Sequence, residues 1–394
     1  MQDRSVVICA GVRTPIGNIG GQFKSITSLD LSIPVLKELV VRSGIDPAHI
    51  ADVIWGCNYQ RTYKENNLAR VALVKAGLPT SVPGMTIHRN CTSSMSSIQL
   101  GYYQIKAGEA DAIIAGGADS MSTAPHMNFN FRYGQKFGHS ELRDSMWDSL
   151  TNLGIGPAMG ITAENVAEKF GITREAQDEY ALLSQQRAVA AQDADRFKDE
   201  IVPVTISSRK GDVSYDTDEY PKRDVSLESL KKLKPAFKDD GSVTAGNASG
   251  MNDASSGVLL VEESKAKEWG LPILARILST ATTGVDPEIM GIGPVSSSQE
   301  ALRKAGLALD DIQLVEINEA FAVQYLAVEK ELGLKRDITN VNGGGISLGH
   351  PVGATGSRIV ITLLYEMRRR GLRYGLAGLC AGGGMGVSVV IEVL

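Results

Sequence analysis

A cysteine, Cys91, lies among small hydroxyl residues in the segment IHRNCTSSMSS, residues 87–97. Met85 and Ile87 before it favour a strand, and SSMSSIQLGYYQIKAG after it favours a helix. We therefore expect Cys91 at a helix N-terminus, where unpaired backbone N–H groups and the helix dipole lower the pKa of a thiol. The alternative is a buried, inert cysteine, although a core would surround it with branched apolar residues. The pattern predicts a thiolate nucleophile.

A histidine and a second thiol occur in two glycine-rich segments. His350 lies in NGGGISLGHPVGATGS, where glycines on both sides predict a tight turn that exposes the ring. Cys380 lies in LCAGGGMGVSVVIEVL, at the expected end of a strand. A dinucleotide-binding loop is excluded, because this loop leads into a strand, GxGxxG spacing is absent, and no GKS or GKT occurs. The amides of Gly382, Gly383 and Gly384 are therefore expected to be free donors.

A polar pair, Asn318 and Glu319, interrupts EINEAFAVQ where a buried strand meets a helix-like run. Polar side chains there need hydrogen-bond partners or a catalytic role, although Asn318 could simply cap the helix. One nucleophilic thiol, one histidine, a second thiol and a row of amides suit acyl transfer at a thioester. A second thiol also suits proton transfer at the carbon next to a carbonyl, which indicates chemistry at carbon–carbon bonds.

The composition limits the function further. With 394 residues, 43% hydrophobic content and a net charge of −5, the chain is expected to hold several layered units and not to bind nucleic acid. No apolar run approaches a membrane span and no signal-peptide pattern occurs, so a soluble, cytoplasmic protein is expected. The four cysteines form no CxxC pair, which predicts reduced thiols and no metal site.

An internal repeat indicates how these residues are positioned. SGIDPAHIADVIWG, from Ser43, resembles AGLALDDIQLVEIN, from Ala305, with Gly44 matching Gly306. GEADAIIAGG, from Gly108, likewise matches GLRYGLAGLC. Each copy is interpreted as a helix, a glycine stop and a buried strand, so the chain is predicted to contain two duplicated α/β halves with helices covering both sheet faces.

Residues between the repeats, roughly 120–249, differ in composition and are interpreted as an inserted domain. Two helices are expected there, one capped by Thr162 and stopped by Gly171, the other capped by Thr173. The domains are expected at residues 1–119 plus 250–271 for the first half, 120–249 for the insertion, and 272–394 for the second half.

Together these segments resemble the thiolase family of acetyl-CoA acetyltransferases and 3-oxoacyl-CoA thiolases. The motifs that carry the resemblance span the chain and include NCTSS, TAGNASGMNDASS, NEAFA, GHPVGATG and CAGGGMG. The resemblance implies a duplicated five-layered αβαβα core with an inserted loop domain. It also implies a dimer or tetramer of identical chains that uses coenzyme A and acyl-CoA as substrates, with no covalently bound cofactor.

The resemblance also assigns roles to individual residues. Cys91 would be acylated, His350 would activate it, and Cys380 would act as acid and base at the substrate α-carbon. Asn318, through a water, and His350 would form one oxyanion hole, and the amides of Cys91 and Gly382 the other. Coenzyme A contacts would come from Ser249, Phe237, Met159, Leu150, Ala320 and Phe321, with Lys222, Arg223, Lys231, Lys232 and Lys234 near the nucleotide phosphates unless they form a solvated basic face.

Departures from the family pattern bear on the substrate. Ser94 stands where the family has glycine, Ala158 where short-chain members commonly have histidine, and Ala254, Ser255 and Ser256 replace a glycine and two alanines. The resemblance therefore leaves open whether acetoacetyl-CoA or a larger 3-oxoacyl-CoA is cleaved. Two alternatives to a thiolase also stay open: a ketoacyl synthase-like condensing enzyme, and a silent acyl-CoA-binding subunit.

Overall fold

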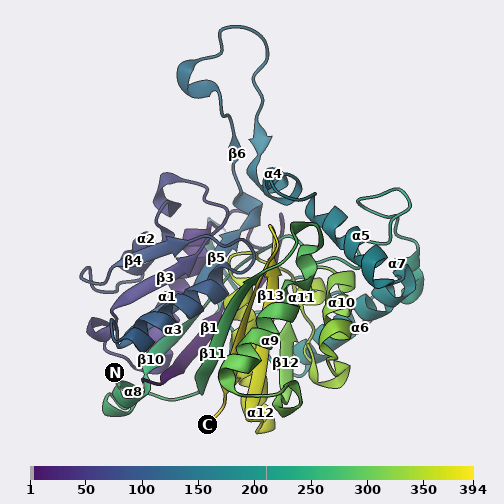
Figure 1. The fold of residues 1–394 in the computed structure, drawn as a ribbon. Coiled ribbons are helices and arrows are strands. Elements are labelled where there is room, and N and C mark those ends of the chain that lie inside the picture. Colours follow the sequence, from purple (N-terminus) through teal and green to yellow (C-terminus); the bar gives the residue numbers. More distant parts are fainter. Residues whose placement is uncertain (1–3, 210) are drawn as a thin grey trace.

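A computed structural model describes residues 4–209 and 211–394, and its centre is a large mixed β-sheet (Figure 1). The strands are β1 (Val6–Arg13), β2 (Gly17–Asn18), β3 (Asp52–Gly56), β4 (Gly84–Ile87), β5 (Ala112–Ser120), β10 (Asn252–Glu262), β11 (Ala275–Gly284), β12 (Leu314–Ile317), β13 (Tyr374–Ala381) and β14 (Met385–Glu392). Their order is β12-β13-β14-β11-β1-β10-β5-β3-β4, with β2 paired to β10. The two predicted halves are thus joined edge to edge, because β1 pairs antiparallel with β11 over Val6–Ile8.

The helices lie outside and between the two half-sheets, as expected. They are α1 (Ser28–Ser43), α2 (Leu68–Lys75), α3 (Ser93–Ala107), α8 (Glu263–Glu268), α9 (Gly293–Ala305), α10 (Ala322–Leu332), α11 (Gly345–Leu348) and α12 (Thr355–Arg370). α1 and α2 cover the first half-sheet, and α9 covers the second. α3 and α12 pack on each other and each contacts strands of both halves, so they form the middle layer. The five-layered αβαβα prediction is confirmed.

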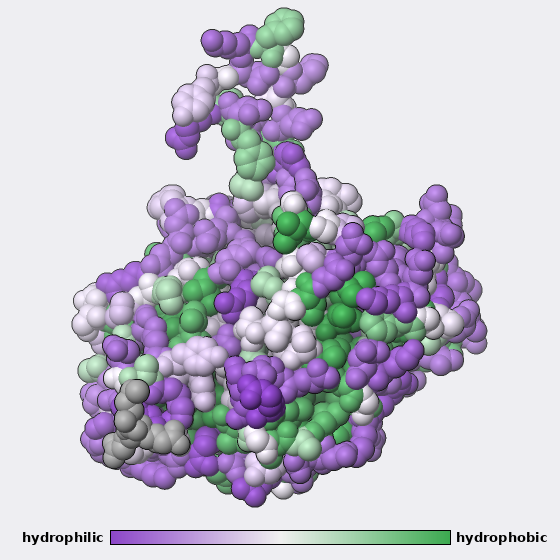
Figure 2. All heavy atoms as spheres, viewed as in Figure 1, coloured by the Kyte–Doolittle hydropathy of each residue, from purple (hydrophilic) through white to green (hydrophobic). Residues whose placement is uncertain are grey.

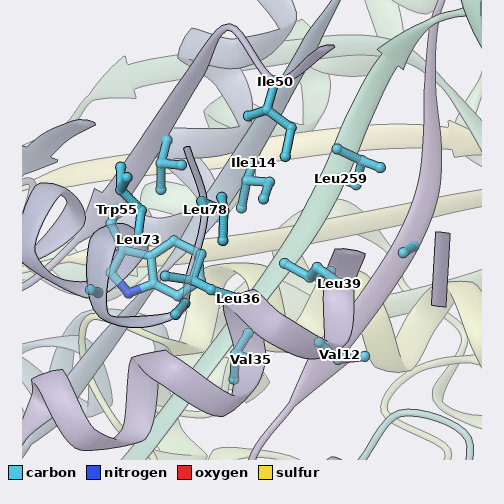
Figure 3. Close-up of a cluster of buried hydrophobic side chains, with 14 of the residues drawn as sticks. Val12, Val35, Leu36, Leu39, Ile50, Trp55, Leu73, Leu78, Ile114 and Leu259 are labelled. Atoms are coloured by element: carbon cyan, nitrogen blue, oxygen red, sulfur yellow. The ribbon is translucent and has the colours of Figure 1, made fainter. Parts of the chain in front are cut away.

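A buried apolar cluster fixes α1 and α2 to the first half-sheet (Figure 3). Leu36 of α1 lies beside the Trp55 ring of β3 (Figure 3), Leu39 belongs to the same cluster, and all three side chains are fully buried. The Trp55 indole Nε1–H donates to Ser32 Oγ at 3.0 Å, so the one polar atom of this ring is satisfied. Burial of each leucine stabilises the fold by about 1.5–3 kcal/mol. The cluster therefore holds α1 and α2 firmly on the first half-sheet.

The internal repeat is confirmed at the level of helix ends. Gly44 ends α1 with φ 70° and Gly306 ends α9 with φ 69°. Gly108 ends α3 with φ 83° and Gly371 ends α12 with φ 64°. These left-handed positions suit glycine because it lacks a Cβ, which is why the glycines mark the repeat.

The segment between the halves contains α4 (Ser145–Thr151), α5 (Met159–Phe170), α6 (Arg174–Asp193), α7 (Leu227–Lys231) and the hairpin of β8 (Val204–Ser208) and β9 (Gly211–Tyr215). Gly171 ends α5 and Thr173 caps α6 by accepting from Ala176 N–H, as predicted. The predicted cap at Thr162 is wrong. α5 begins earlier, at Met159, and the Thr162 hydroxyl donates to the Met159 carbonyl inside the helix.

An arm formed by residues 128–142 projects from the body above α4 (Figure 1). It leaves through the short pair of β6 (His126–Met127) and β7 (Arg143–Asp144). Aromatic side chains on it are highly exposed, including Phe131 and Phe137 at 72% and 96%. In the described ranges, none of the helices combines the length and apolarity needed to cross a membrane.

Candidate active site

Cys91 lies between β4 and α3, at the predicted strand-to-helix turn. The Gly382 backbone N–H bonds to the Cys91 thiol, and the Cys91 N–H also lies against its own sulfur. Asn90 adopts a left-handed conformation with φ 47°, and its side-chain amide donates to the Gly382 carbonyl at 2.7 Å. Asparagine tolerates this backbone region better than most residues. Asn90 therefore joins the nucleophile loop to the glycine-rich loop of the other half.

The predicted ionisation of Cys91 is wrong. Burial of the thiol group raises its pKa to about 11, even though the Gly382 and Cys91 amides favour the thiolate. The charge of Asp119 raises the pKa further. Desolvation outweighs these two amides because the apolar side chains packed around Cys91 disfavour the charged sulfur. At neutral pH the Cys91 side chain is therefore a thiol, and its use as a nucleophile would require a base.

His350 is the candidate for such a base, and its hydrogen bonds fix the tautomer of the ring. Its Nδ1 lies 2.7 Å from Thr355 Oγ1, and the Thr355 hydroxyl donates to the Pro351 carbonyl at 2.8 Å. A carbonyl only accepts, so the single hydroxyl hydrogen of Thr355 is used there and Nδ1–H must be the donor from the ring. The Nε2 lone pair is then available, and Nε2 has no hydrogen-bond partner among the described residues.

His350 is buried rather than exposed, which corrects the sequence prediction. The turn predicted from the flanking glycines exists, with Gly349 at φ 105°, but it directs the ring into the protein. Burial, assisted by the charge of Arg358, lowers the pKa of His350 to about 3. The imidazole is therefore neutral, as a proton acceptor must be.

Asp119, which the sequence interpretation missed, docks the histidine loop on the first half. This buried carboxylate at the end of β5 accepts from Gly353 N–H at 2.6 Å, from Asn58 N–H and Nδ2–H, and from Tyr59 N–H at 3.0 Å. Asn252 Oδ1 accepts from His350 N–H at 2.9 Å. A carboxylate directly after a run of apolar strand residues was the available signal, because such a group needs several donors.

Asn318 and Glu319 are adjacent and both polar, but only Glu319 has hydrogen-bond partners for its side chain among the described residues. Glu319 accepts from the Tyr180 and Ser184 hydroxyls, both at 2.7 Å, and from Ile346 N–H, so it is a structural anchor. Asn318 is just as buried, yet neither atom of its side-chain amide has a hydrogen-bond partner in residues 4–209 and 211–394. It does not cap α10, whose N-cap is Phe321. A buried free amide is costly unless it serves a ligand or the reaction.

Cys380 is the second-to-last residue of β13, just before the turn into β14. Gly383 and Gly384 have φ of 88° and 82°, the conformation of a tight hairpin turn. The Gly384 amide donates to the Ala381 carbonyl at 3.2 Å, so it is not free as predicted. Burial raises the pKa of the Cys380 thiol, and a charge on Cys91 raises it further. The Gly382 amide that bonds to the Cys91 thiol lies two residues after Cys380, so the two sulfurs belong to one site.

Most of the predicted coenzyme A contacts gather beside these thiols. Ser249 N–H donates to the Ala320 carbonyl at 2.9 Å, and the rings of Phe237 and Phe321 meet edge to face, with centroids 6.3 Å apart. Met159 packs in one apolar cluster with Ala320, Phe321 and Cys380. These residues connect the half-exposed Phe237 ring to the second thiol through packed apolar contacts, and this set of residues is called the Phe237–Met159 path below.

Comparison with known proteins places both halves of this site in one family. Residues 6–264 match the family described as thiolase, N-terminal domain, and residues 271–393 match thiolase, C-terminal domain. The chain belongs to the thiolase family. It is 51% identical over 389 residues to an acetyl-CoA acetyltransferase of Chromobacterium violaceum, with 98% of this chain and 99% of the relative covered.

Solved structures of this family have the same fold. An acetyl-CoA acetyltransferase of Bacillus anthracis superposes with a TM-score of 0.97 at 49% identity, covering 99% of each chain. Human mitochondrial 3-ketoacyl-CoA thiolase in complex with CoA superposes with a TM-score of 0.95 at 44% identity, covering 99% of this chain and 98% of the other. In this thiolase-family chain, Cys91 comes from the N-terminal match, whereas Asn318, His350 and Cys380 come from the C-terminal one.

Other predicted contacts are less well supported by the geometry. Leu150 is half-buried in α4, but Leu153 is the leucine over the reactive loop, with Cδ1 2.9 Å from where a Cβ on Gly382 would lie. Arg223 is engaged by Asp193 through two hydrogen bonds of 2.6 and 2.9 Å. Lys222 Nζ lies 5.2 Å from the centre of the Tyr220 ring. Arg223 is thus already paired with a carboxylate, and the proposed contact of these cations with the nucleotide phosphates stays a prediction.

An apolar cluster lies directly against Cys91 and was not predicted. Tyr59, Met121 and Val352 are buried there, and Ala124 and Met146 pack against them. The Tyr59 hydroxyl lies 2.8 Å from Ser149 Oγ of α4, which fixes the position of the ring. This cluster is separate from the one that contains Met159 and Phe321. The first packs against Cys91, whereas the second includes Cys380.

Proposed function

We propose that this chain is an acyl-CoA thiolase that works by ping-pong acyl transfer through a Cys91 thioester. The observation that carries the proposal is the shared site of the half-buried Cys91 thiol and the buried Cys380 thiol, with the Gly382 amide bonded to Cys91. A neutral His350 with a free Nε2 and the unpartnered Asn318 amide complete the set. Relatives named acetyl-CoA acetyltransferase and 3-ketoacyl-CoA thiolase support the same reaction class.

In the first half-reaction, His350 Nε2 takes the Cys91 proton and the sulfur attacks the 3-oxo carbon of a 3-oxoacyl-CoA. The amides of Cys91 and Gly382 hold the resulting oxyanion. The bond between C2 and C3 then breaks, and its electron pair forms the enolate of acetyl-CoA. Asn318, through a water, and the protonated His350 stabilise this enolate, and Cys380 donates the proton that completes acetyl-CoA.

In the second half-reaction, the Cys380 thiolate takes the proton of the coenzyme A thiol, and the coenzyme A sulfur attacks the acyl-Cys91 thioester. The new carbon–sulfur bond forms the shortened acyl-CoA, and the Cys91 sulfur leaves and regains its proton from His350. The reverse sequence joins two acetyl-CoA molecules into acetoacetyl-CoA after Cys380 removes an α-proton. Both directions use the same groups, because microscopic reversibility requires it.

Coenzyme A is proposed to approach along the Phe237–Met159 path. The inserted domain, residues 120–249, would hold it, with Ser249, Ala320 and Phe321 at its inner edge. The Phe237 ring covers Gly160 so closely that a Cβ there would lie 2.1 Å from Phe237 Cγ, which keeps this wall thin and apolar. The acyl group would extend to the other side of Cys91, toward Tyr59, Met121 and Val352.

Acetoacetyl-CoA is the substrate that we expect to be cleaved most efficiently. The packed cluster of Tyr59, Met121 and Val352 leaves a short acyl group as the best fit beside Cys91. The test compares kcat/KM for coenzyme A-dependent thiolysis of acetoacetyl-CoA and of a medium-chain 3-oxoacyl-CoA. We expect about a 10-fold or larger preference for acetoacetyl-CoA, since several methylenes would have to displace packed side chains.

Other outcomes of this assay have defined meanings. Preference for the longer substrate would show that Ala158 opens the site and that the enzyme is a degradative thiolase of fatty-acid metabolism. Cleavage of neither substrate, with no acyl group gained by the intact protein, would favour the silent subunit. Acylation from a carrier-protein thioester but not from acyl-CoA would favour the ketoacyl synthase-like alternative.

We propose that the arm joins identical chains into an oligomer. Exposed aromatic groups, Phe131 and Phe137 among them, lie along an arm that projects far from the core, and Figure 2 shows hydrophobic groups at its tip and its base. Such groups gain stability by burial on another copy. Replacing both phenylalanines with serine should lower the molar mass measured by light scattering. Replacing Val41, equally exposed on α1, should leave that mass unchanged.

The arm substitutions lie outside the core, so the thermal midpoint of an isolated protomer should not change. An unchanged oligomer in the double variant would mean that the arm does not join the chains.

The cytoplasm is the proposed compartment, because Cys9, Cys57, Cys91 and Cys380 are all free thiols and thiolase chemistry needs two of them reduced.

A further inference from the structure

Ser94, one of the departures from the family pattern, contacts the helix that orients His350. Its buried Oγ accepts from Ser357 N–H at 3.0 Å. Ser357 is the third residue of α12, and the N-cap of this helix, Ala354, offers no side-chain acceptor. The first turn of a helix has unpaired N–H groups that normally require such an acceptor. Ser94 therefore caps α12 from the neighbouring helix α3.

Ser256, a second departure, contacts the same turn from β10. Its hydroxyl donates to the Ala354 carbonyl at 2.6 Å and lies 2.5 Å from the Ser357 hydroxyl. The Ser357 hydroxyl also reaches the Ser256 carbonyl at 3.1 Å. Two buried hydroxyls from separate elements thus hold both ends of one short segment, residues 354–357. Glycine at position 94 could not accept from Ser357 N–H, and alanine at position 256 could not donate to the Ala354 carbonyl.

This segment carries Thr355, the residue that orients the catalytic imidazole. Thr355 Oγ1 accepts from His350 Nδ1–H, and its position depends on the first turn of α12. The turn also packs tightly on α3, since a Cβ on Gly356 would lie 2.5 Å from Met95 N. A shift of the turn would therefore move Thr355 relative to Cys91, which precedes α3.

We propose that Ser94 and Ser256 are positioning residues that set the orientation of His350 toward Cys91 through the first turn of α12. The inference rests on the proposed function, because it assigns His350 as the base for Cys91. Neither serine touches the substrate. Their effect is on the alignment of a proton transfer, which is sensitive to displacements of about 1 Å.

The experiment measures the rate at which Cys91 is acylated by acetyl-CoA, followed by intact-protein mass, from pH 6 to pH 9. The variants are Ser94→Ala and Ser256→Ala, each also combined with His350→Ala. Ser97→Ala is the matched control, because Ser97 is equally buried on α3 but donates only to the Ser93 carbonyl within its own helix. We expect about a 10-fold slower acylation at pH 7 for each single variant, with KM for coenzyme A unchanged.

The combined variants separate positioning from general stability. If the serines act through His350, removing either in the His350→Ala background should not slow acylation further. An equal slowing in that background, or rates that match Ser97→Ala despite a lower thermal midpoint, would overturn the inference. A wild-type protein that gains no acyl group would instead overturn the proposed function, so the two failures are distinguishable.

Discussion

Replacing Cys91 with alanine is expected to reduce thiolysis by about 10⁴-fold or more and to abolish the acyl group that the intact protein gains from acyl-CoA. The variant keeps His350, Cys380 and the glycine amides but has no sulfur to form the thioester. A ping-pong reaction cannot proceed without that intermediate. Coenzyme A binding should persist, because the Phe237–Met159 path does not depend on the thiol.

The matched control for this prediction is Cys9→Ala. Cys9 is a buried thiol in β1, in the core beneath the outer helices, and burial raises its pKa as it does for Cys91. Its removal should lower the thermal midpoint slightly and leave the acyl adduct intact. An adduct that persists in Cys91→Ala would place the nucleophile elsewhere, with Cys380 the first alternative.

The fold was largely predictable because its signals are local. Gly44, Gly306, Gly108 and Gly371 end helices through their own backbone freedom, so the repeat could be found without any tertiary information. The error at Thr162 is of the opposite kind. A threonine before an amphipathic run fits a cap, but the hydroxyl instead bonds within a helix that begins earlier.

The chemistry of the site was less predictable because ionisation depends on packing. The helix N-terminus before α3 correctly predicts where Cys91 lies, yet the pKa rises because residues distant in the sequence exclude water from the thiol. The glycines around His350 likewise predict a turn but not its direction. Asp119 contacts the second half at Gly353, and Leu153 reaches Gly382 from the inserted segment; the sequence carries only weak signals for such distant contacts.

Serine at positions 94 and 256 shows a third limit. The sequence identified both residues as departures from the family pattern, and these departures left the choice of substrate open. In the structure both hydroxyls bond to the first turn of α12, and neither serine belongs to the apolar cluster of Tyr59 and Met121 beside Cys91. A departure from a family pattern therefore identifies an unusual residue, whereas its contacts in the structure show which part of the site it affects.

Replacing His350 with alanine is expected to slow Cys91 acylation by about 10³-fold at pH 7 and to change its pH dependence. With a pKa of about 11, only about one part in 10⁴ of the Cys91 thiol is ionised at pH 7. Without a base, the rate should follow this fraction and rise about 10-fold per pH unit toward pH 11. The wild-type rate should be nearly flat from pH 5 to pH 9.

The flat profile follows from the sign of both shifts. Burial lowers the pKa of His350 to about 3, so the imidazole stays a neutral acceptor at any pH above that value and is not lost near 6.5. The raised pKa of Cys91 keeps the proton available for transfer below about pH 11. His49→Ala is the control, since that ring is exposed and stacks on Trp269. A wild-type inflection near pH 6.5 would contradict the buried imidazole, and a flat profile in His350→Ala would remove His350 as the base.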